Sequence, residues 1–129
     1  MKYKKQREEA AYFMRRLYDK NLTTTSGGNI SVRLSDGIVL VTPSAIDKGR
    51  IFSKQIGITT IDGKNQTPHL KPTIEIFMHL NIYKKRSDIS AVVHAHPVTA
   101  SSFTASGKKI NINLIAESRA ILGKIVFAK

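Results

Sequence analysis

The chain has 129 residues, of which 41% are hydrophobic and 23% are charged. This length and composition predict one compact globular domain over residues 1–129, and they exclude a fibrous or disordered chain. No apolar run approaches the roughly 18 residues of a membrane-spanning helix, and residues 1–9 are rich in charge rather than apolar like a signal core. Cysteine is absent, which excludes disulfides and thiolate ligands. We therefore expect a cytoplasmic protein without membrane contact.

The formal net charge is +12, from 21 Lys and Arg against 9 Asp and Glu. Such a charge is compatible with a nucleic-acid partner or with an anionic small substrate. The basic residues are scattered, however, and no helix-turn-helix, RNP-type or zinc-finger pattern accompanies them. Solvated basic faces explain such a pattern better than a nucleic-acid interface. We therefore do not expect nucleic acid as a partner.

The first half of the chain predicts a helix followed by antiparallel strands. Apolar residues at helical spacing between Lys5 and Lys20 predict an amphipathic helix that covers one side of a sheet. Alternating apolar residues after position 29, a tight turn at residues 35–37 and the apolar run 38–41 predict a β-hairpin over residues 29–42. We expect a short helical turn within residues 45–52 and a further strand over residues 56–61.

The second half predicts helices around one more strand. Pro72 and the apolar stripe that follows it predict a helix as far as Arg86, with Glu75 in its first turn. The run Ile89–Val93 predicts a buried strand. A helix is expected from residue 97 to 106, and Gly107 separates it from a last apolar region that reaches residues 127–129. Together these elements predict an α+β fold with a central, mostly antiparallel sheet between helices.

The strongest functional signal is the pair of histidines in His94-Ala95-His96, directly after the predicted strand. Side chains alternate along a strand, so both imidazoles are expected to point to one face, close enough to share a metal ion. The spacing alone is equally compatible with hydrogen-bonded core histidines. A carboxylate from the start of a neighbouring helix would complete the ligand set, and Glu75 is placed to supply it. Such nitrogen and oxygen ligands are typical of Zn²⁺, Fe²⁺ and Mn²⁺ sites, and Co²⁺ is also chemically possible.

Short polar segments are candidates for binding an anion. The paired glycines before Asn29 permit positive φ and expose backbone N–H groups that can cradle an anion. Hydroxyl residues beside proline occur at Thr42-Pro43-Ser44 and at Thr73. Each of these features alone is more typical of an ordinary loop. If they converge beside the metal, they could hold a phosphate while the metal binds another part of the same substrate.

The sequence resembles the class II aldolase and adducin superfamily in the segments Gly27–Arg33, Thr42–Ser44, Lys71–Glu75 and Val92–Pro97, which occur in the family's order. The resemblance implies an αβα-layered fold, a Zn²⁺ ion and a cyclic homotetramer with active sites between subunits. It implies that His94 and His96 are metal ligands, and that Glu75 is the acid/base residue and also contacts the metal. The residues that would surround a substrate phosphate are Gly28, Asn29, Ser44, Ala45, Thr73 and Ile74.

The activity implied by the resemblance is cleavage of a ketose phosphate through a metal-stabilised enediolate, with Glu75 moving the proton. A sugar-phosphate epimerase or dehydratase on the same fold, or a non-catalytic metal-binding or interaction module of the adducin type, is an alternative. Two features depart from the family. Ile74 replaces a hydroxyl residue, and the third zinc-binding histidine, expected in an Asn-His-Gly turn after the His-x-His, has no counterpart before the sequence ends. His69 and His79 are poor substitutes, so the chain resembles the N-terminal portion of a complete member.

Overall fold

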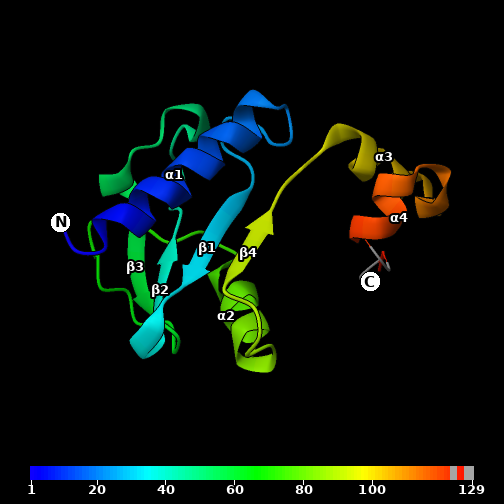
Figure 1. The fold of residues 1–129 in the computed structure, drawn as a ribbon. Helices are drawn as coiled ribbons and strands as arrows, with labels where there is room; N and C mark the ends of the chain where they lie inside the picture. Colours follow the sequence, from blue (N-terminus) through cyan, green and yellow to red (C-terminus); the bar gives the residue numbers. More distant parts are fainter. Residues whose placement is uncertain (123–124, 127–129) are drawn as a thin grey trace. The chain divides into compact units, whose positions relative to one another are not determined.

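The computed structural model describes residues 1–122 and 125–126. It contains two compact units, Met1–His96 and Pro97–Lys129. The first unit carries a four-stranded sheet between two helices, and the second includes two further helices (Figure 1). The expectation of a single domain over residues 1–129 stays a prediction. Among the described residues, no helix has the length and apolar character needed to cross a lipid bilayer.

The sheet has the strand order β3-β2-β1-β4, and all neighbouring strands are antiparallel. Its strands are β1 (Asn29–Arg33), β2 (Ile38–Val41), β3 (Gly57–Thr60) and β4 (Ala91–His94). β1 and β2 form the predicted hairpin, in which Val32 lies opposite Leu40, and a 3₁₀ turn over Ser35–Gly37 joins them. β3 confirms the strand expected over residues 56–61, and a 3₁₀ turn at Lys48–Arg50 confirms the helical turn expected before it.

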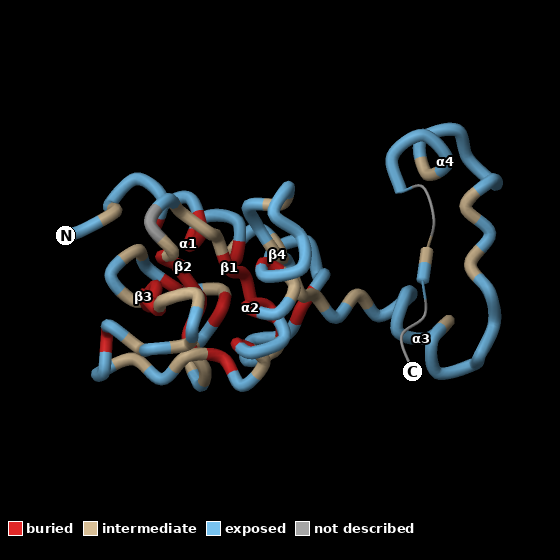
Figure 2. The backbone as a smooth tube through the Cα atoms, turned by 90° about the horizontal axis from the view of Figure 1, so that it is seen from below, coloured by how far each residue is buried: buried red, intermediate tan, exposed pale blue. Residues whose placement is uncertain are grey.

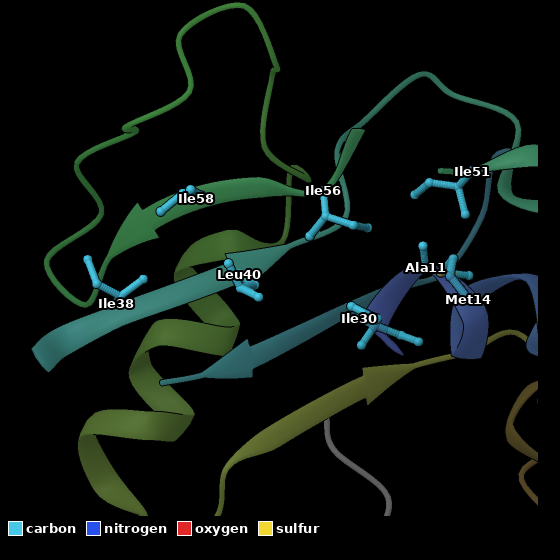
Figure 3. Packing of buried hydrophobic residues seen from close by; sticks show 9 residues of the cluster. Ala11, Met14, Ile30, Ile38, Leu40, Ile51, Ile56 and Ile58 are labelled. Atoms are coloured by element: carbon cyan, nitrogen blue, oxygen red, sulfur yellow. The ribbon is translucent and has the colours of Figure 1, made fainter. Parts of the chain in front are cut away.

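Helix α1 (Lys4–Asp19) covers one face of the sheet, as its apolar spacing predicts. Its buried face consists of Ala10, Ala11 and Met14. Alternate residues of the strands, including Ile30 and Leu40, point to this face, and isoleucines from β3 and from the segment before it complete the cluster. Figure 3 labels most of these side chains: Ala11, Met14, Ile30, Ile38, Leu40, Ile51, Ile56 and Ile58.

Helix α2 (Ile76–Lys85) covers the opposite face of the sheet. It buries Ile76, Leu80 and Tyr83 against Val39 and Val41, the β2 residues that alternate with those facing α1. Successive side chains of β2 point to opposite faces of the sheet and therefore contribute to both cores. The expected αβα layering with a mostly antiparallel sheet is confirmed.

Two local predictions were wrong. α2 begins at Ile76, so Glu75 occupies the N-cap position rather than the first turn. The reason is that the backbone around Pro72 pairs with Pro43 in an isolated β-bridge, which keeps the chain extended before the helix. The strand predicted to be buried, β4, lies at the end of the sheet, and its residues Ala91 and Val93 are exposed because they line an open cavity beside α1.

The second unit contains α3 (Val98–Ser106) and α4 (Ala116–Leu122). α3 confirms the helix expected from residue 97 to 106, and it ends at Gly107, whose φ of 68° is easily adopted only by glycine. The apolar region predicted to reach residues 127–129 lies partly outside the described residues. Within the described part of the chain, buried residues occur between Arg7 and Tyr83 (Figure 2), so the cores described above belong to the first unit.

Candidate functional site

A cavity of about 310 Å³ in the first unit collects the polar segments singled out in the sequence. Its lining consists of Ser26, Gly27, Gly28, Asn29, Pro43, Ser44, Ala45, Lys48, Thr73, Ile74, Glu75 and His96. Every residue predicted to surround a phosphate is in this set, and so are Glu75 and His96. His94 is not part of the lining, but its ring contacts both of these residues. The structure therefore brings the predicted site residues together; their roles remain predictions.

Backbone hydrogen bonds connect the segments that form this cavity. Ser44 donates from its backbone N–H to the Lys71 carbonyl and from its hydroxyl to the Pro72 carbonyl, both over 2.9 Å. The backbone N–H of Lys48 donates to the Thr25 carbonyl over 2.8 Å. These bonds tie the loop after β2 to the loop before β1 on one side and to the segment before α2 on the other. The loops that line the cavity are thus held together by hydrogen bonds to one another.

The two glycines of the lining are required by the close approach of neighbouring groups. Gly28 has φ +66°, and a Cβ atom there would lie 2.5 Å from the Thr23 hydroxyl oxygen and 2.9 Å from the His94 carbonyl oxygen. A Cβ atom on Gly27 would lie 3.1 Å from the imidazole Nδ1 of His96. Side chains at these positions would therefore push the histidine segment away from the loop.

The two histidines converge, although by a different route from the one predicted. β4 ends at His94, so His96 lies beyond the strand and strand alternation does not fix its direction. Instead the backbone N–H of His96 donates to the Leu22 carbonyl over 2.8 Å, which anchors the segment to the chain that follows α1. The two Nε2 atoms are 2.7 Å apart, and the ring planes meet at 74°.

Glu75 joins this pair from the N-cap of α2. One carboxylate oxygen, Oε1, lies 3.6 Å from His94 Nε2, and the other, Oε2, accepts a hydrogen bond from the side-chain amide of Asn29. The Asn29 side-chain oxygen is buried, and no partner for it is present among residues 1–122 and 125–126. The side chains of His94 and Glu75 are 28% and 33% exposed, so both remain open to a ligand.

Two imidazole nitrogens and one carboxylate oxygen form a donor set that fits a divalent transition-metal ion. Among the described residues, however, no three His, Cys, Asp or Glu side chains are arranged to hold a metal ion together. Nitrogen ligands at ~2.0 Å from one tetrahedral zinc lie roughly 3.3 Å apart, so the 2.7 Å imidazole separation must widen when a metal binds. Oε1 of Glu75 is the oxygen on the His94 side, so the hydrogen bond from Asn29 to Oε2 can be kept. The chemistry of the donors fits the ion, and small side-chain rotations would complete the geometry.

Lys48 is the site residue that sequence reasoning missed. Its side chain is 2% exposed, and its ammonium donates to the Pro43 carbonyl over 2.6 Å. Burial lowers the pKa of this ammonium from its ordinary value. One lysine among many in a basic chain carries no sequence signal, because its position follows from the short turn after Pro43 rather than from a motif.

His79 lies inside the layer between α2 and the sheet and is not part of the cavity lining. Its Nδ1 is 2.7 Å from the Ser31 hydroxyl, which also contacts the Tyr83 hydroxyl over 2.8 Å. Desolvation lowers its pKa, while the nearby charge of Glu75 acts in the opposite direction. The neutral form of His79 therefore belongs to a buried hydrogen-bond network, consistent with its prediction as a poor substitute ligand. His69 is an exposed loop residue.

Known proteins resemble this chain in both sequence and fold. An L-fuculose phosphate aldolase of Methanococcus maripaludis is 35% identical over 114 residues, which are 88% of this chain and 61% of that protein. A methylthioribulose-1-phosphate dehydratase of Granulibacter bethesdensis is 40% identical over 84 residues, 64% of this chain and 39% of the relative. The solved structure of an L-fuculose 1-phosphate aldolase has a TM-score of 0.73 at 31% identity, and the match covers 79% of this chain and 49% of that one.

Each match covers most of this chain but a smaller part of the relative. The chain spans about three fifths of the length of the first curated relatives it matches, 61% and 59% of them. Within this chain, residues 8–128 match the family model described as the class II aldolase and adducin N-terminal domain. The chain therefore belongs to the class II aldolase and adducin family.

Proposed function

We propose that this chain forms the metal- and phosphate-binding part of an aldolase-type lyase that cleaves a ketose phosphate. The observation that carries the proposal is the meeting of Glu75, His94 and His96 beside the loops that line the cavity. Its relatives include enzymes named for phosphorylated sugars. We further propose that the active protein is a cytoplasmic homo-oligomer, as the family resemblance implies.

Glu75 is the residue best placed to move protons. Cleavage of a ketose removes the proton from the hydroxyl on one side of the breaking carbon–carbon bond, and the bonding electrons pass to the carbonyl side as an enediolate. A proton is then returned to that carbon to give the second product. A carboxylate that is one third exposed and hydrogen-bonded by Asn29 can accept and return such a proton. Asn29 would hold the carboxylate in position between the two transfers.

His94 and His96 would hold a divalent cation, with Glu75 as a further ligand before substrate enters. When bound, the cation would supply Lewis-acid stabilisation of the negative charge that develops on the substrate's carbonyl side. The backbone and hydroxyl groups of the loops at Gly28, Ser44 and Thr73 would hold the phosphate away from the reacting carbons. The residues proposed to hold the phosphate line the same cavity as Glu75 and His96, and His94 contacts both of these residues.

Metal content tests the site before its chemistry. We expect elemental mass spectrometry of the purified chain to find zinc or another divalent metal in near-stoichiometric amount, and a His94→Ala, His96→Ala double variant to lose it. The exposed histidine variant His69→Ala is a matched control that should retain the metal. If neither the parent chain nor the control takes up added zinc, then the fold is present without a metal site, and the non-catalytic module becomes the better description.

Measuring the products of the reaction distinguishes an aldolase from a dehydratase and from a non-catalytic module. We expect the metal-loaded chain to release dihydroxyacetone phosphate from L-fuculose 1-phosphate, measured by coupled oxidation of NADH. Glu75→Gln should reduce the rate by roughly 100-fold or more, because general acid–base catalysis contributes on this scale, whereas Glu8→Gln on the exposed face of α1 should have no effect. The 40% identity to a dehydratase makes dehydration of a ketose 1-phosphate the second candidate, recognised by loss of water without carbon–carbon cleavage.

A further inference from the structure

Lys48 is a buried cation in the wall of the candidate site. It is 2% exposed and lines the 310 Å³ cavity together with the loops at residues 26–28 and 43–45. Its ammonium donates to one carbonyl, that of Pro43. Within residues 1–122 and 125–126, the ion pairs do not include Lys48, so no carboxylate lies within 4.0 Å of its ammonium.

A buried ammonium without a counter-ion is energetically unfavourable. Removing the charge from water has a cost that a single carbonyl contact does not fully offset, and most buried lysines are therefore paired. The neighbouring carboxylate of Asp47 does not serve this purpose, since it accepts from the backbone N–H of Gly49 and lies 3.8 Å from Arg50. An anion delivered from the cavity would remove this cost and would reverse the lowering of the Lys48 pKa.

The other residues of the lining offer neither a counter-ion for Lys48 nor a second positive charge for an anion. Glu75 is the carboxylate of the cavity, and it is already bound by Asn29 and close to His94. Ile74 is 84% exposed and has no polar side-chain atom, so it adds no hydrogen bond to an anion. The hydroxyl residues of the lining, such as Ser44 and Thr73, are neutral. Among the described residues of the lining, Lys48 is the only lysine or arginine, so a doubly charged ligand would meet its ammonium there.

We propose that Lys48 is a specificity-determining residue, whose ammonium pairs with the phosphate of the substrate and so selects a phosphate ester over the corresponding neutral sugar. The inference rests on the proposed function for the identity of the substrate. Lys48 would supply the positive charge that the neutral loops of the lining lack. The Pro43 carbonyl then holds the ammonium toward the loop that carries Ser44 and Ala45.

Calorimetric titration of the full chain with dihydroxyacetone phosphate and with dihydroxyacetone tests this assignment. Lys48→Met should weaken binding of the phosphate ester by roughly 10- to 100-fold, the scale of a charge-assisted hydrogen bond, and should leave binding of the neutral compound unchanged. Lys48→Arg should recover most of the affinity. Lys64→Met, an exposed lysine of the same unit, is the matched control and should bind both compounds as the parent chain does.

Equal affinity of the parent chain and Lys48→Met for the phosphate ester would overturn the assignment. So would the absence of any binding by the parent chain up to about 10 mM ligand. If Lys48→Met does not fold, the parent chain labelled with ¹⁵N-lysine provides the answer. A buried ammonium exchanges slowly and gives its own signal, identified by its loss in Lys48→Arg, and inorganic phosphate should shift this signal. An unmoved signal at saturating phosphate would contradict the proposal.

The same experiments distinguish this inference from the proposed function. Lys48-dependent binding of inorganic phosphate without cleavage of L-fuculose 1-phosphate would leave the inference standing and remove the lyase activity. Cleavage with the same kcat/KM in Lys48→Met and the parent chain would support the lyase and remove the inference. A raised KM with unchanged kcat in the variant would support both, because uniform binding energy would then have been lost.

Discussion

One residue of the cavity, Ala45, has a backbone conformation that its side chain disfavours. Ala45 has φ 56°, in the left-handed region that residues with a Cβ atom rarely adopt. Gly28 has a similar φ without this cost, since it lacks a Cβ atom. Ala45 is kept in place because the flanking Ser44 is bonded to the segment before α2 and Lys48 is bonded back to Pro43. Local strain of this kind is common at ligand sites.

The strain at Ala45 can be measured. Ala45→Gly should raise the free energy of unfolding by ~0.5–1 kcal/mol, because the relief of left-handed strain exceeds the extra freedom that glycine gives the unfolded chain. Ala45→Val is the opposite control and should destabilise the chain, since a β-branched residue is least tolerant of positive φ. Urea unfolding followed by circular dichroism measures both. A Gly variant less stable than the parent chain would show that the loop carries no strain.

Residue types with a strong local pattern were predictable, and those placed by tertiary contacts were not. The glycines before Asn29 and the two histidines stand out in the sequence because their chemistry is unusual at that spacing. Lys48 does not stand out, because its burial depends on the path of the chain between β2 and β3. The convergence of His94 and His96 was expected, but the hydrogen bond to Leu22 that produces it joins segments far apart in the sequence.

At the scale of elements, Arg7 connects α1 to the segment before β3. It is 6% exposed, and its guanidinium donates to the carbonyls of Ser53, Lys54 and Ile56. A rigid planar fork of donors suits several carbonyls at once. The helix is thus fixed to the sheet by polar contacts as well as by the apolar face around Met14.

Replacement of Arg7 by Met should therefore lower the free energy of unfolding by about 3 kcal/mol, since hydrogen bonds from a charged donor are lost and partly buried carbonyls are left without partners. Arg16→Met on the exposed side of the same helix should change it by less than about 0.5 kcal/mol. Chemical denaturation of the two variants gives the comparison. Equal stability of Arg7→Met and Arg16→Met would mean that the carbonyls are satisfied by water when the guanidinium is absent.

The elements themselves were largely predictable, because periodicity reports which faces are buried. α1, the β1–β2 hairpin, β3 and α3 follow from apolar spacing and turn residues in the sequence. β4 was misjudged because its run of β-branched residues is the same for an edge strand as for a central one, and only the order of the strands decides which it is. The start of α2 was misplaced because a bridge between Pro43 and Pro72 has no local signal.

At the scale of the whole molecule, the first unit has a second cavity, of about 470 Å³, on its α1 side. Apolar side chains that line it include Phe13 on α1, Val32 on β1 and Val93 on β4. Phe13 and Val93 are 45% and 57% exposed. Apolar surface of this kind attracts other apolar groups.

The 470 Å³ cavity should bind the dye ANS while the chain is fully folded. A Phe13→Lys, Val93→Lys double variant should lose most of the fluorescence increase and should associate less in solution, with a melting temperature close to that of the parent chain because both side chains are already largely exposed. The control is a double variant, Glu9→Lys with Arg16→Glu, which changes charged residues of the same cavity and should retain the dye. Undiminished fluorescence in the Phe13 and Val93 variant would place the dye elsewhere.

The pairing of β1 with β4 has a consequence for how the protein matures. Asn29, which donates to Glu75, lies opposite His94 in this ladder. A slip of one residue would bring Val93 opposite Asn29 and turn the His94 imidazole to the other side of the sheet. The buried residues of both cores lie on other elements, but Val92 of β4 packs against the core under α2 and would turn away from it. A misaligned molecule would thus keep most of its secondary structure and its dichroism spectrum, while it would lack the contact between His94 and Glu75.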